Sequence, residues 1–162
     1  MKIADLFEDW GMTGLKVNVG FLSMDWQPQP EEQQAAWELY IELLTRVATQ
    51  PLADEEGDEQ TALDSVYKLF RLTRDLLKAR GRKAETFSKI AIIVLNQKIR
   101  PFTAKWHKAS VNGDLADSQT SKQFRHDLRE IQAVLRNYAA MLASIAGVED
   151  LQKLDQGALR EL

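Results

Sequence analysis

The sequence contains no cysteine. Disulfide bonds, thiolate nucleophiles and thiolate metal sites are therefore excluded for this chain. The absence does not indicate a compartment, because a chain without cysteine is compatible with oxidising and with reducing surroundings. Glycine is also sparse, with eight residues scattered along the chain, and we find no internal repeat and no low-complexity tract.

Long hydrophobic runs are missing as well. No apolar run approaches the roughly 20 residues that a helix needs to cross a bilayer. The N-terminal segment MKIADLFEDW carries acidic residues and lacks the apolar core of a signal peptide. We therefore expect a cytoplasmic protein that does not act at a membrane.

The motifs of several enzyme classes are absent too. The chain has no GxxxxGK loop, no GxSxG turn, no HExxH motif and no Glu-x-x-His pair around His107 or His126. Asp127 and Glu130 could act as acids beside His126, but their helical spacing is more typical of a solvated helix face. We therefore expect no catalytic residue, no metal and no cofactor. An enzyme that uses His107 with Lys105, or with a distant carboxylate, is an alternative.

The charges are unevenly distributed, although the formal net charge is only −3. Residues 1–60 hold 13 acidic and three basic side chains, whereas residues 68–108 hold 12 basic and two acidic ones. Such polarity favours either attraction between two segments of the chain or contact with a charged partner.

The most apolar long stretch runs from Phe87 to His107. Its apolar residues recur at three- and four-residue steps and cover most of a helix circumference, namely Phe87, Ile90, Ala91, Ile93, Val94, Leu95 and Ile99. Residues 90–95 alone would fit a buried strand, but the whole pattern is too long for one, which predicts a buried central helix. Pro101 has no amide hydrogen and restricts the residue before it, so we expect this helix to end or kink near Arg100.

Three further segments have apolar stripes at helical spacing. One begins at Pro30, which is followed by two glutamates, and continues to about Thr49. The second covers about residues 59–79, and the last is capped by Ser118 or Thr120 and ends before Gly147. Four amphipathic helices joined by short loops predict a helical bundle.

A different period occurs near the N-terminus. Apolar residues alternate with other residues at Leu15, Val17, Val19 and Phe21, which is typical of a strand, and the alternation changes face near residues 20–22. We find no second convincing strand in the sequence. Because a lone strand leaves backbone groups unpaired, we expect it to pair with a second copy, with another protein or with an unrecognised strand.

The predicted fold is therefore mainly α, a four-helix bundle with a short N-terminal β segment. We expect one domain over residues 1–162, because this length is enough for a single core. It consists of an N-terminal helix and strand arm over residues 1–26, a four-helix core over 31–146 and a C-terminal tail over 147–162.

Two surfaces are candidates for binding a partner. The first is the predicted strand, by edge pairing, and the second is the cluster of cations and aromatic residues around the expected helix break. Their candidate contact residues are Val17, Val19, Phe21, Arg100, Lys105, Trp106 and His107. For the second surface the alternative is that Phe102 and Trp106 close the core while the lysines face water.

Nucleic-acid binding is a second possibility. Seven cations follow one helix face and the turn after it, at Lys68, Arg71, Arg74, Lys78, Arg80, Arg82 and Lys83. Phosphates attract such a stripe whatever the base sequence. The acidic first third of the chain would compete for the same cations, which weighs against this interpretation.

Three segments also carry a resemblance: AWELYIELLTRVATQPL, LNQKIRPFTAKWH and FRHDLREIQAVLRNYAAMLASIAGV. Together they resemble uncharacterised small helical proteins of bacterial conflict and antiphage defence loci, over roughly residues 6–150. The resemblance implies a subunit of a bacterial multi-protein system and brings no catalytic residues. From the sequence we therefore expect a non-catalytic adaptor, regulator or sensor that binds a protein or a second copy of itself.

Overall fold

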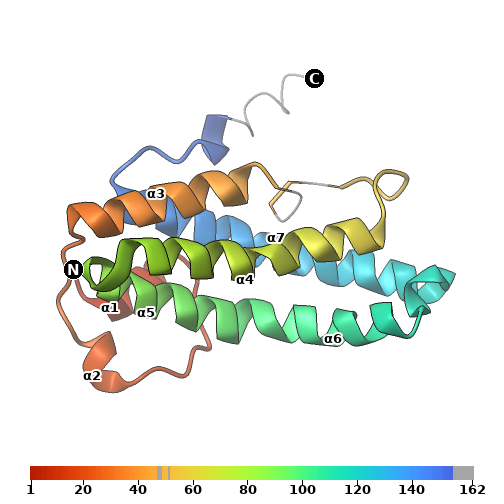
Figure 1. Ribbon diagram of the computed structural model, residues 1–162, viewed down its shortest axis with the longest axis horizontal. Coiled ribbons are helices and arrows are strands. Elements are labelled where there is room, and N and C mark those ends of the chain that lie inside the picture. The colour runs from red at the N-terminus through yellow and green to blue at the C-terminus, as the bar shows by residue number, and fades with distance from the viewer. Residues whose placement is uncertain (47–48, 51, 155–162) are drawn as a thin grey trace.

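A computed structural model describes residues 1–46, 49, 50 and 52–154 of the chain, and these residues are mainly helical. The prediction of a mainly α protein is confirmed. Figure 1 shows the elements in order: α1 (Ile3–Asp9), α2 (Val19–Leu22), α3 (Pro30–Leu44), α4 (Glu59–Arg80), η1 (Gly81–Ala84), α5 (Glu85–Val94), η2 (Leu95–Ile99), α6 (Arg100–Val111), η3 (Asp114–Ala116) and α7 (Ser118–Ala146).

Long helical rods lie side by side with their axes roughly aligned, formed by α3, by α4, by α5 with η2 and α6, and by α7 (Figure 1). Helix α7 packs most extensively against α3 and also contacts α4, η2 and α6. One cluster of buried apolar side chains joins the rods and includes residues from α1 as well. Because every long helix contributes its apolar stripe to this one cluster, the described residues share a single core.

Helix α7 follows the sequence prediction closely. The side chain of Asp117 accepts a hydrogen bond from the Thr120 N–H (N···O 3.0 Å), which starts the helix, and Gly147 ends it with φ +73°. The apolar stripe predicted for this helix is half-buried at Val134 and buried at Phe124, Leu128, Ile131, Leu135, Tyr138, Leu142 and Ile145. The three- and four-residue spacing therefore identified the core face of this helix correctly.

The central stretch forms a longer rod than predicted. The α-helical pattern changes at η2, where the Arg100 N–H donates to the carbonyl oxygen of Leu95, five residues earlier. This π-helical turn precedes Pro101, which has no N–H to donate to residue 97. The expected interruption near Arg100 is therefore present as a change of hydrogen-bond register. The chain does not leave the helix there, because α6 continues the same rod to Val111 (Figure 1).

Helix α3 ends earlier than the sequence predicts, at Leu44 instead of about Thr49. The Thr49 hydroxyl donates to the Leu43 carbonyl oxygen (2.6 Å), and the Gln50 side-chain amide donates to the Leu44 carbonyl oxygen (3.1 Å). These two side chains satisfy carbonyl groups that the end of the helix leaves open. Residues 47, 48 and 51 lie outside the described residues.

The prediction of an N-terminal β segment is wrong. Within the described residues there is no strand, and Val19–Leu22 form the short helix α2. An isolated antiparallel bridge joins Lys2 and Asp25 instead, with a hydrogen bond from the Ile3 N–H to the Met24 carbonyl oxygen (3.1 Å). The apolar residues alternate as in a strand, but Asn18 starts a helical turn instead, because its side chain accepts a hydrogen bond from the Phe21 N–H (3.2 Å).

The backbone that was expected to need an outside partner is hydrogen-bonded within the chain. The Lys16 N–H donates to Gln97 Oε1 (2.8 Å), and Gln97 Nε2 donates to the Lys16 carbonyl oxygen (2.8 Å). The Lys98 ammonium group also donates to the carbonyl oxygen of Thr13. Gln97 and Lys98 of η2 thus bind the backbone at Thr13 and Lys16, at the start of the predicted strand. These contacts within the chain remove the reason for expecting edge pairing with a second copy.

Glu32 connects the N-terminal arm to the starts of two helices. Its carboxylate is buried and accepts hydrogen bonds from Trp26 Nε1 (2.9 Å), the Gln29 N–H (3.0 Å) and the Phe87 N–H (3.1 Å). Gln29 caps α3, and Phe87 lies in the first turn of α5. The acid therefore satisfies backbone donors at two positive helix ends while it anchors the indole of Trp26.

The other end of the molecule has a partly buried ion pair. Arg125 of α7 contacts Glu59 at the start of α4, with Nε···Oε1 at 2.9 Å. Its Nη1 also donates to the carbonyl oxygens of Ala53 (3.1 Å) and Glu56 (3.0 Å). Burial raises the pKa of Glu59, but hydrogen bonds from Ser121 and Arg125 outweigh it and leave the pKa lowered. This contact fixes the acidic loop before α4 against α7.

The segment after α7 folds back onto α3. The Tyr40 hydroxyl donates to Asp150 Oδ1 (3.0 Å) and accepts a hydrogen bond from the Leu151 N–H (2.6 Å). Of the predicted tail over residues 147–162, residues 155–162 lie outside the described residues. Across residues 1–46, 49–50 and 52–154, no helix combines the length and the apolarity needed to cross a membrane.

We predict that Glu32→Gln destabilises the protein by about 1–3 kcal/mol, because the new amide group replaces an acceptor with a donor and leaves a buried N–H unsatisfied. The free energy of unfolding in urea measures this. Glu31→Gln is the matched control, because Glu31 is more exposed and its carboxylate lies 3.7 Å from the Arg80 guanidinium group, beyond hydrogen-bond distance. Equal stability of the two variants would contradict the role of Glu32.

A second prediction compares two buried tyrosines. Among the described residues the Tyr138 hydroxyl has no hydrogen-bond partner, although the side chain is buried. Tyr138→Phe should therefore leave the free energy of unfolding unchanged or raise it. Tyr40→Phe loses both of its hydrogen bonds and should lower that free energy by about 1–2 kcal/mol. If Tyr138→Phe lowers the free energy of unfolding more than Tyr40→Phe does, the Tyr138 hydroxyl has a hydrogen-bond partner and the prediction is wrong.

Candidate functional site

A groove with basic edges runs between α4 and the rod formed by α5 and η2. Its volume is about 400 Å³, and its lining residues are Phe70, Thr73, Arg74, Leu77, Lys78, Ser88, Ile92, Leu95, Asn96 and Arg100. We call it the basic groove. It combines an apolar floor with cations, and no carboxylate is among these lining residues of the described chain.

The α4 wall of the basic groove follows from the width of the apolar stripe of that helix. The centre of the stripe, which includes Leu69 and Thr73, is buried in the core. Phe70 and Leu77 lie at the edge of the stripe and are only partly buried, so their outer surfaces form the floor of the groove. Arg74 lies one position beyond Thr73 and is exposed at the rim.

The opposite wall is formed by α5, η2 and the first residue of α6. Ile92 is 48% exposed, which is unusual for a large aliphatic side chain, while Leu95 beside it is buried. Arg100 is positioned by Asn96, whose Oδ1 accepts hydrogen bonds from Nε (3.1 Å) and Nη2 (3.0 Å). The guanidinium carbon of Arg100 lies 4.7 Å from the centre of the Phe70 ring, a cation–π contact that joins the two walls.

The cations of the basic groove are available for an anionic ligand. Within the described residues, none of Arg74, Lys78 and Arg100 forms an ion pair with a carboxylate. The nearby Arg71 is paired with Asp75 at 3.7 Å, but both of these side chains are strongly exposed. An apolar cleft whose cations have no neutralising partner attracts a ligand that has both apolar and negatively charged groups.

A second hollow lies on the other side of α4, towards α3. It has a volume of about 420 Å³ and an apolar surface from Trp37, Ile41, Leu72 and Leu76. Its acids already have partners, because Glu38 accepts a hydrogen bond from Arg80 and Glu42 Oε2 lies 2.8 Å from Arg46 Nη2. This hollow therefore lacks the unpaired charge that distinguishes the basic groove.

The structure separates the seven cations that were predicted as a nucleic-acid surface. Lys68, Arg71, Arg74 and Lys78 follow an exposed face of α4, and Arg82 and Lys83 are exposed in η1. Arg80 points instead towards α3, where it forms ion pairs with Glu31 and Glu38. The helical part of the prediction therefore gathers on one surface, but Arg80 does not belong to it.

The predicted partner-binding residues are also separated. Arg100 lies in the basic groove, and the exposed His107 ring contacts Tyr67 with ring centres 5.8 Å apart. Trp106 is buried, packs edge-on against Phe124 at 5.1 Å and donates from Nε1 to Asp127 Oδ2 (3.1 Å). Trp106 therefore closes the core and has no free indole surface for a partner.

The other predicted contact residues lie outside the basic groove. Lys105 forms an ion pair with Asp127 (Nζ···Oδ2 2.7 Å). Val19 is 78% exposed on α2, whereas Val17 and Phe21 are half-buried, with Phe21 packed against the core. None of these four residues lines the groove among the described residues. The expected role of Val17, Val19 and Phe21 in strand pairing has lost its structural basis, because the described residues contain no strand.

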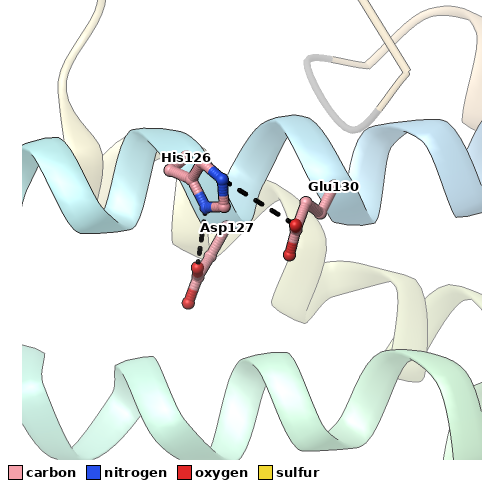
Figure 2. A group of neighbouring side chains, drawn as sticks. All are labelled: His126, Asp127 and Glu130. Carbon is pink, nitrogen blue, oxygen red and sulfur yellow. Dashed lines mark hydrogen bonds and ion pairs between the residues drawn. The ribbon is translucent and has the colours of Figure 1, made fainter.

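His126, Asp127 and Glu130 form the cluster in Figure 2, whose ligand atoms lie within 4.8 Å of one another. His126 Nδ1 is 3.4 Å from Asp127 Oδ1, and Nε2 is 3.8 Å from Glu130 Oε1. Asp127 is already the acceptor for Lys105, Trp106 and Gln123. The Lys105 ammonium group lies 2.7 Å from Oδ2 of the same carboxylate, so a metal ion on Oδ1 would be repelled by this neighbouring cation. The contact between Asp127 and Lys105 is an ion pair that links α7 to α6.

The surroundings of Asp127 explain its ionisation. Burial raises the pKa of this carboxyl group, but hydrogen bonds from Lys105, Gln123 and His126 favour the charged form more strongly. The pKa is therefore lowered from its ordinary value of 3.8. A charged Asp127 at neutral pH holds α6 against α7.

The sequence missed several residues of the basic groove, namely Phe70, Ser88, Ile92 and Asn96. A partial signal was present, because the apolar stripe of residues 59–79 is wider than a single core face requires. The exposure of Ile92 could not be read from residues 90–95, where it sits inside a continuous apolar run. Only the packing of the rods decides which side of that run is left uncovered.

We predict that Asp127→Asn lowers the free energy of unfolding at pH 7 by about 1–3 kcal/mol, because Lys105 loses its charged partner. The folded state lowers the pKa of Asp127, so this stabilisation is present above pH 3.8 and is lost as the pH falls through the folded value. Urea unfolding at several pH values checks this. Glu130→Gln is the control, because Glu130 is 70% exposed. If wild type and Asp127→Asn still differ in free energy of unfolding at acidic pH, the explanation is contradicted.

Comparisons with protein-family models, with curated proteins and with solved structures gave no match to this chain. The function is therefore inferred from the chain's own residues, and the basic groove is the site that they support best.

Proposed function

We propose that the protein is a non-catalytic interaction subunit that binds a protein partner through the basic groove. The observation that carries this proposal is the combination of a partly exposed apolar floor with three cations that have no carboxylate partner within the described part of the chain. The sequence resemblance suggests the setting, a bacterial multi-protein system of the antiphage defence type. In this proposal the helical rods form a four-helix bundle that acts as a rigid scaffold for the groove.

The construction of the basic groove supports a docking role. Both walls are helices whose inner sides are packed in the core, so the floor keeps its shape without a ligand. Protein interfaces typically have an apolar centre and a polar rim, and the groove has this arrangement. The rim cations would set which partner binds and how fast it associates, and the floor would supply the affinity.

Nucleic-acid binding is the second candidate, and one observation favours it. Lys68 and Arg71 extend the line of exposed cations on α4 beyond the groove, next to the exposed ring of Tyr67. Cations with an adjacent aromatic ring are the usual elements of single-strand binding surfaces. The aliphatic floor at Leu77 and Ile92 weighs against it, because such a surface gives the polar edges of bases no hydrogen bonds.

The fourth prediction tests the groove by charge reversal. Wild-type protein, a groove variant (Arg74→Glu, Lys78→Glu, Arg100→Glu) and a surface control (Lys108→Glu, Lys122→Glu, Lys153→Glu) are used as bait in extracts of the native cells. The control makes the same change of net charge at exposed helical positions outside the groove lining. Captured proteins are quantified by mass spectrometry, and thermal melts verify that each bait is folded.

We expect at least one protein to be captured by the wild type and by the control, and to be reduced about tenfold or more with the groove variant. Equal capture by all three baits would contradict the proposal. Salt-dependent binding of a labelled duplex or single strand that the groove variant loses, with no groove-dependent protein, would instead support the nucleic-acid candidate.

A further inference from the structure

We infer that the basic groove accepts an amphipathic α-helix with acidic residues on both sides of its apolar face. This inference rests on the proposed function and specifies the chemistry of the partner. The length of the groove, the secondary structure of its walls and the positions of its cations each support it.

The length of the basic groove matches a short helical segment. Along α4 the lining extends from Phe70 to Lys78, eight residue steps, which corresponds to about 12 Å at 1.5 Å per residue. A partner helix of about two turns has the same length and presents apolar side chains at positions i, i+3 or i+4, and i+7. Two or three such side chains fit over the floor formed by Phe70, Leu77 and Ile92.

The walls of the groove exclude the other common modes of peptide recognition. Strand addition needs an open sheet edge with unpaired backbone groups, and both walls here are helices whose backbone groups are paired along the helix. Recognition of polyproline segments and of bases relies on open aromatic faces. The guanidinium group of Arg100 covers one face of the Phe70 ring, so this ring offers little stacking surface. An aliphatic floor between two helices is suited to the side chains of a third helix.

The cations are spread along the whole groove. Arg100 contacts Phe70 and therefore marks one end, and Lys78 lies eight residues further along α4 and marks the other. Arg74 lies between them on the α4 side, while Arg100 comes from the opposite wall. A bound helix would thus meet cations on both of its flanks, which explains why acids are needed on both sides of its apolar face.

The chain's own acidic helix is a weaker occupant. Helix α3 has Glu38 and Glu42 beside the partly buried Trp37 and Ile41, so a second copy could offer an acidic amphipathic face. Both acids are already paired within the chain, to Arg80 and to Arg46, and docking would have to break or share these ion pairs. A separate partner with free carboxylates does not meet this obstacle.

The test uses a defined probe. A fluorescent helical peptide of about 15 residues carries leucine at i, i+4 and i+7 and glutamate on both flanks, and a second peptide replaces every glutamate with lysine. Binding to the full chain is measured by fluorescence anisotropy at two salt concentrations. Labelled oligo(dT) serves as the nucleic-acid probe, and sedimentation of the protein at micromolar concentration measures self-association.

Five proteins are compared: wild type, the groove variant, the surface control, Ile92→Ser, and Val111→Ser as the matched control for Ile92→Ser. Ile92 is 48% exposed and Val111 is 72% exposed, so neither replacement removes a core side chain. We expect the glutamate peptide to bind wild type, the surface control and Val111→Ser alike. Affinity should fall about tenfold or more for the groove variant and several-fold for Ile92→Ser, and the lysine peptide should not bind.

Several results would overturn the inference: equal affinity for the two peptides, binding that the groove variant retains, competition by oligo(dT) at the same cations, or a wild-type dimer that the groove variant converts to monomer. The proposed function fails separately. If a native protein is captured in a groove-dependent way but the glutamate peptide does not bind, the groove is a docking site for a partner of different chemistry. If neither result is obtained, both the proposed function and the inference are wrong.

Discussion

The buried carboxylate of Glu32 is the interaction on which the arrangement of the helices depends. A charged group in an apolar interior is strongly unfavourable unless hydrogen bonds replace its hydration, and here three N–H groups do so. Those donors come from the arm, from the cap of α3 and from the first turn of α5, which are far apart in the sequence. Satisfying one carboxylate therefore fixes where the arm ends, where α3 begins and where the central rod starts relative to it. The partly buried pair of Arg125 and Glu59 has a similar role at the opposite end, between α7 and the start of α4.

The π-helical turn η2 connects the arm with the basic groove. On one side its Gln97 side chain pairs with the backbone of Lys16 as a neighbouring strand would, in both directions. On the other side Asn96 holds the guanidinium group of Arg100 at the edge of the groove. The extra residue in the turn lies directly before Pro101, which has no N–H to donate to the preceding turn. A local backbone irregularity thus supplies side chains to two different contacts, as such turns often do at functional positions.

Helix α4 shows how one amphipathic sequence serves the fold and the candidate site together. The centre of its apolar stripe is buried against α3, α6 and α7, and the two edges of the stripe remain partly uncovered because neighbouring rods are round and diverge at their surfaces. On the α3 side the surrounding charges neutralise one another through Arg80 and Arg46. On the α5 side, Arg74, Lys78 and Arg100 form no ion pair with a carboxylate of the described residues. The difference between the two hollows therefore lies in ion pairing, since both have a comparable volume and an apolar surface.

The sequence by itself determined the helices and their buried faces, because a stripe at three- and four-residue spacing must be covered whatever its neighbours are. The inner residues of α7 and the proline-directed change near Arg100 follow from local chemistry, whereas the cap of α7 is Asp117 and not the predicted Ser118 or Thr120. Tertiary structure decided what depends on residues distant in the sequence. Residues 15–25 alternate like a strand. However, backbone N–H groups in this segment donate to the side chains of Asn18, which caps a helical turn, and of Gln97, and no neighbouring strand is involved. Trp106 and Arg100 are close in sequence and were both predicted to contact a partner, but packing against Phe124 buries the first, and the gap between α4 and α5 exposes the second. Which side of an apolar run stays uncovered, and which cations lack a partner, are properties of the assembled rods and not of any single segment.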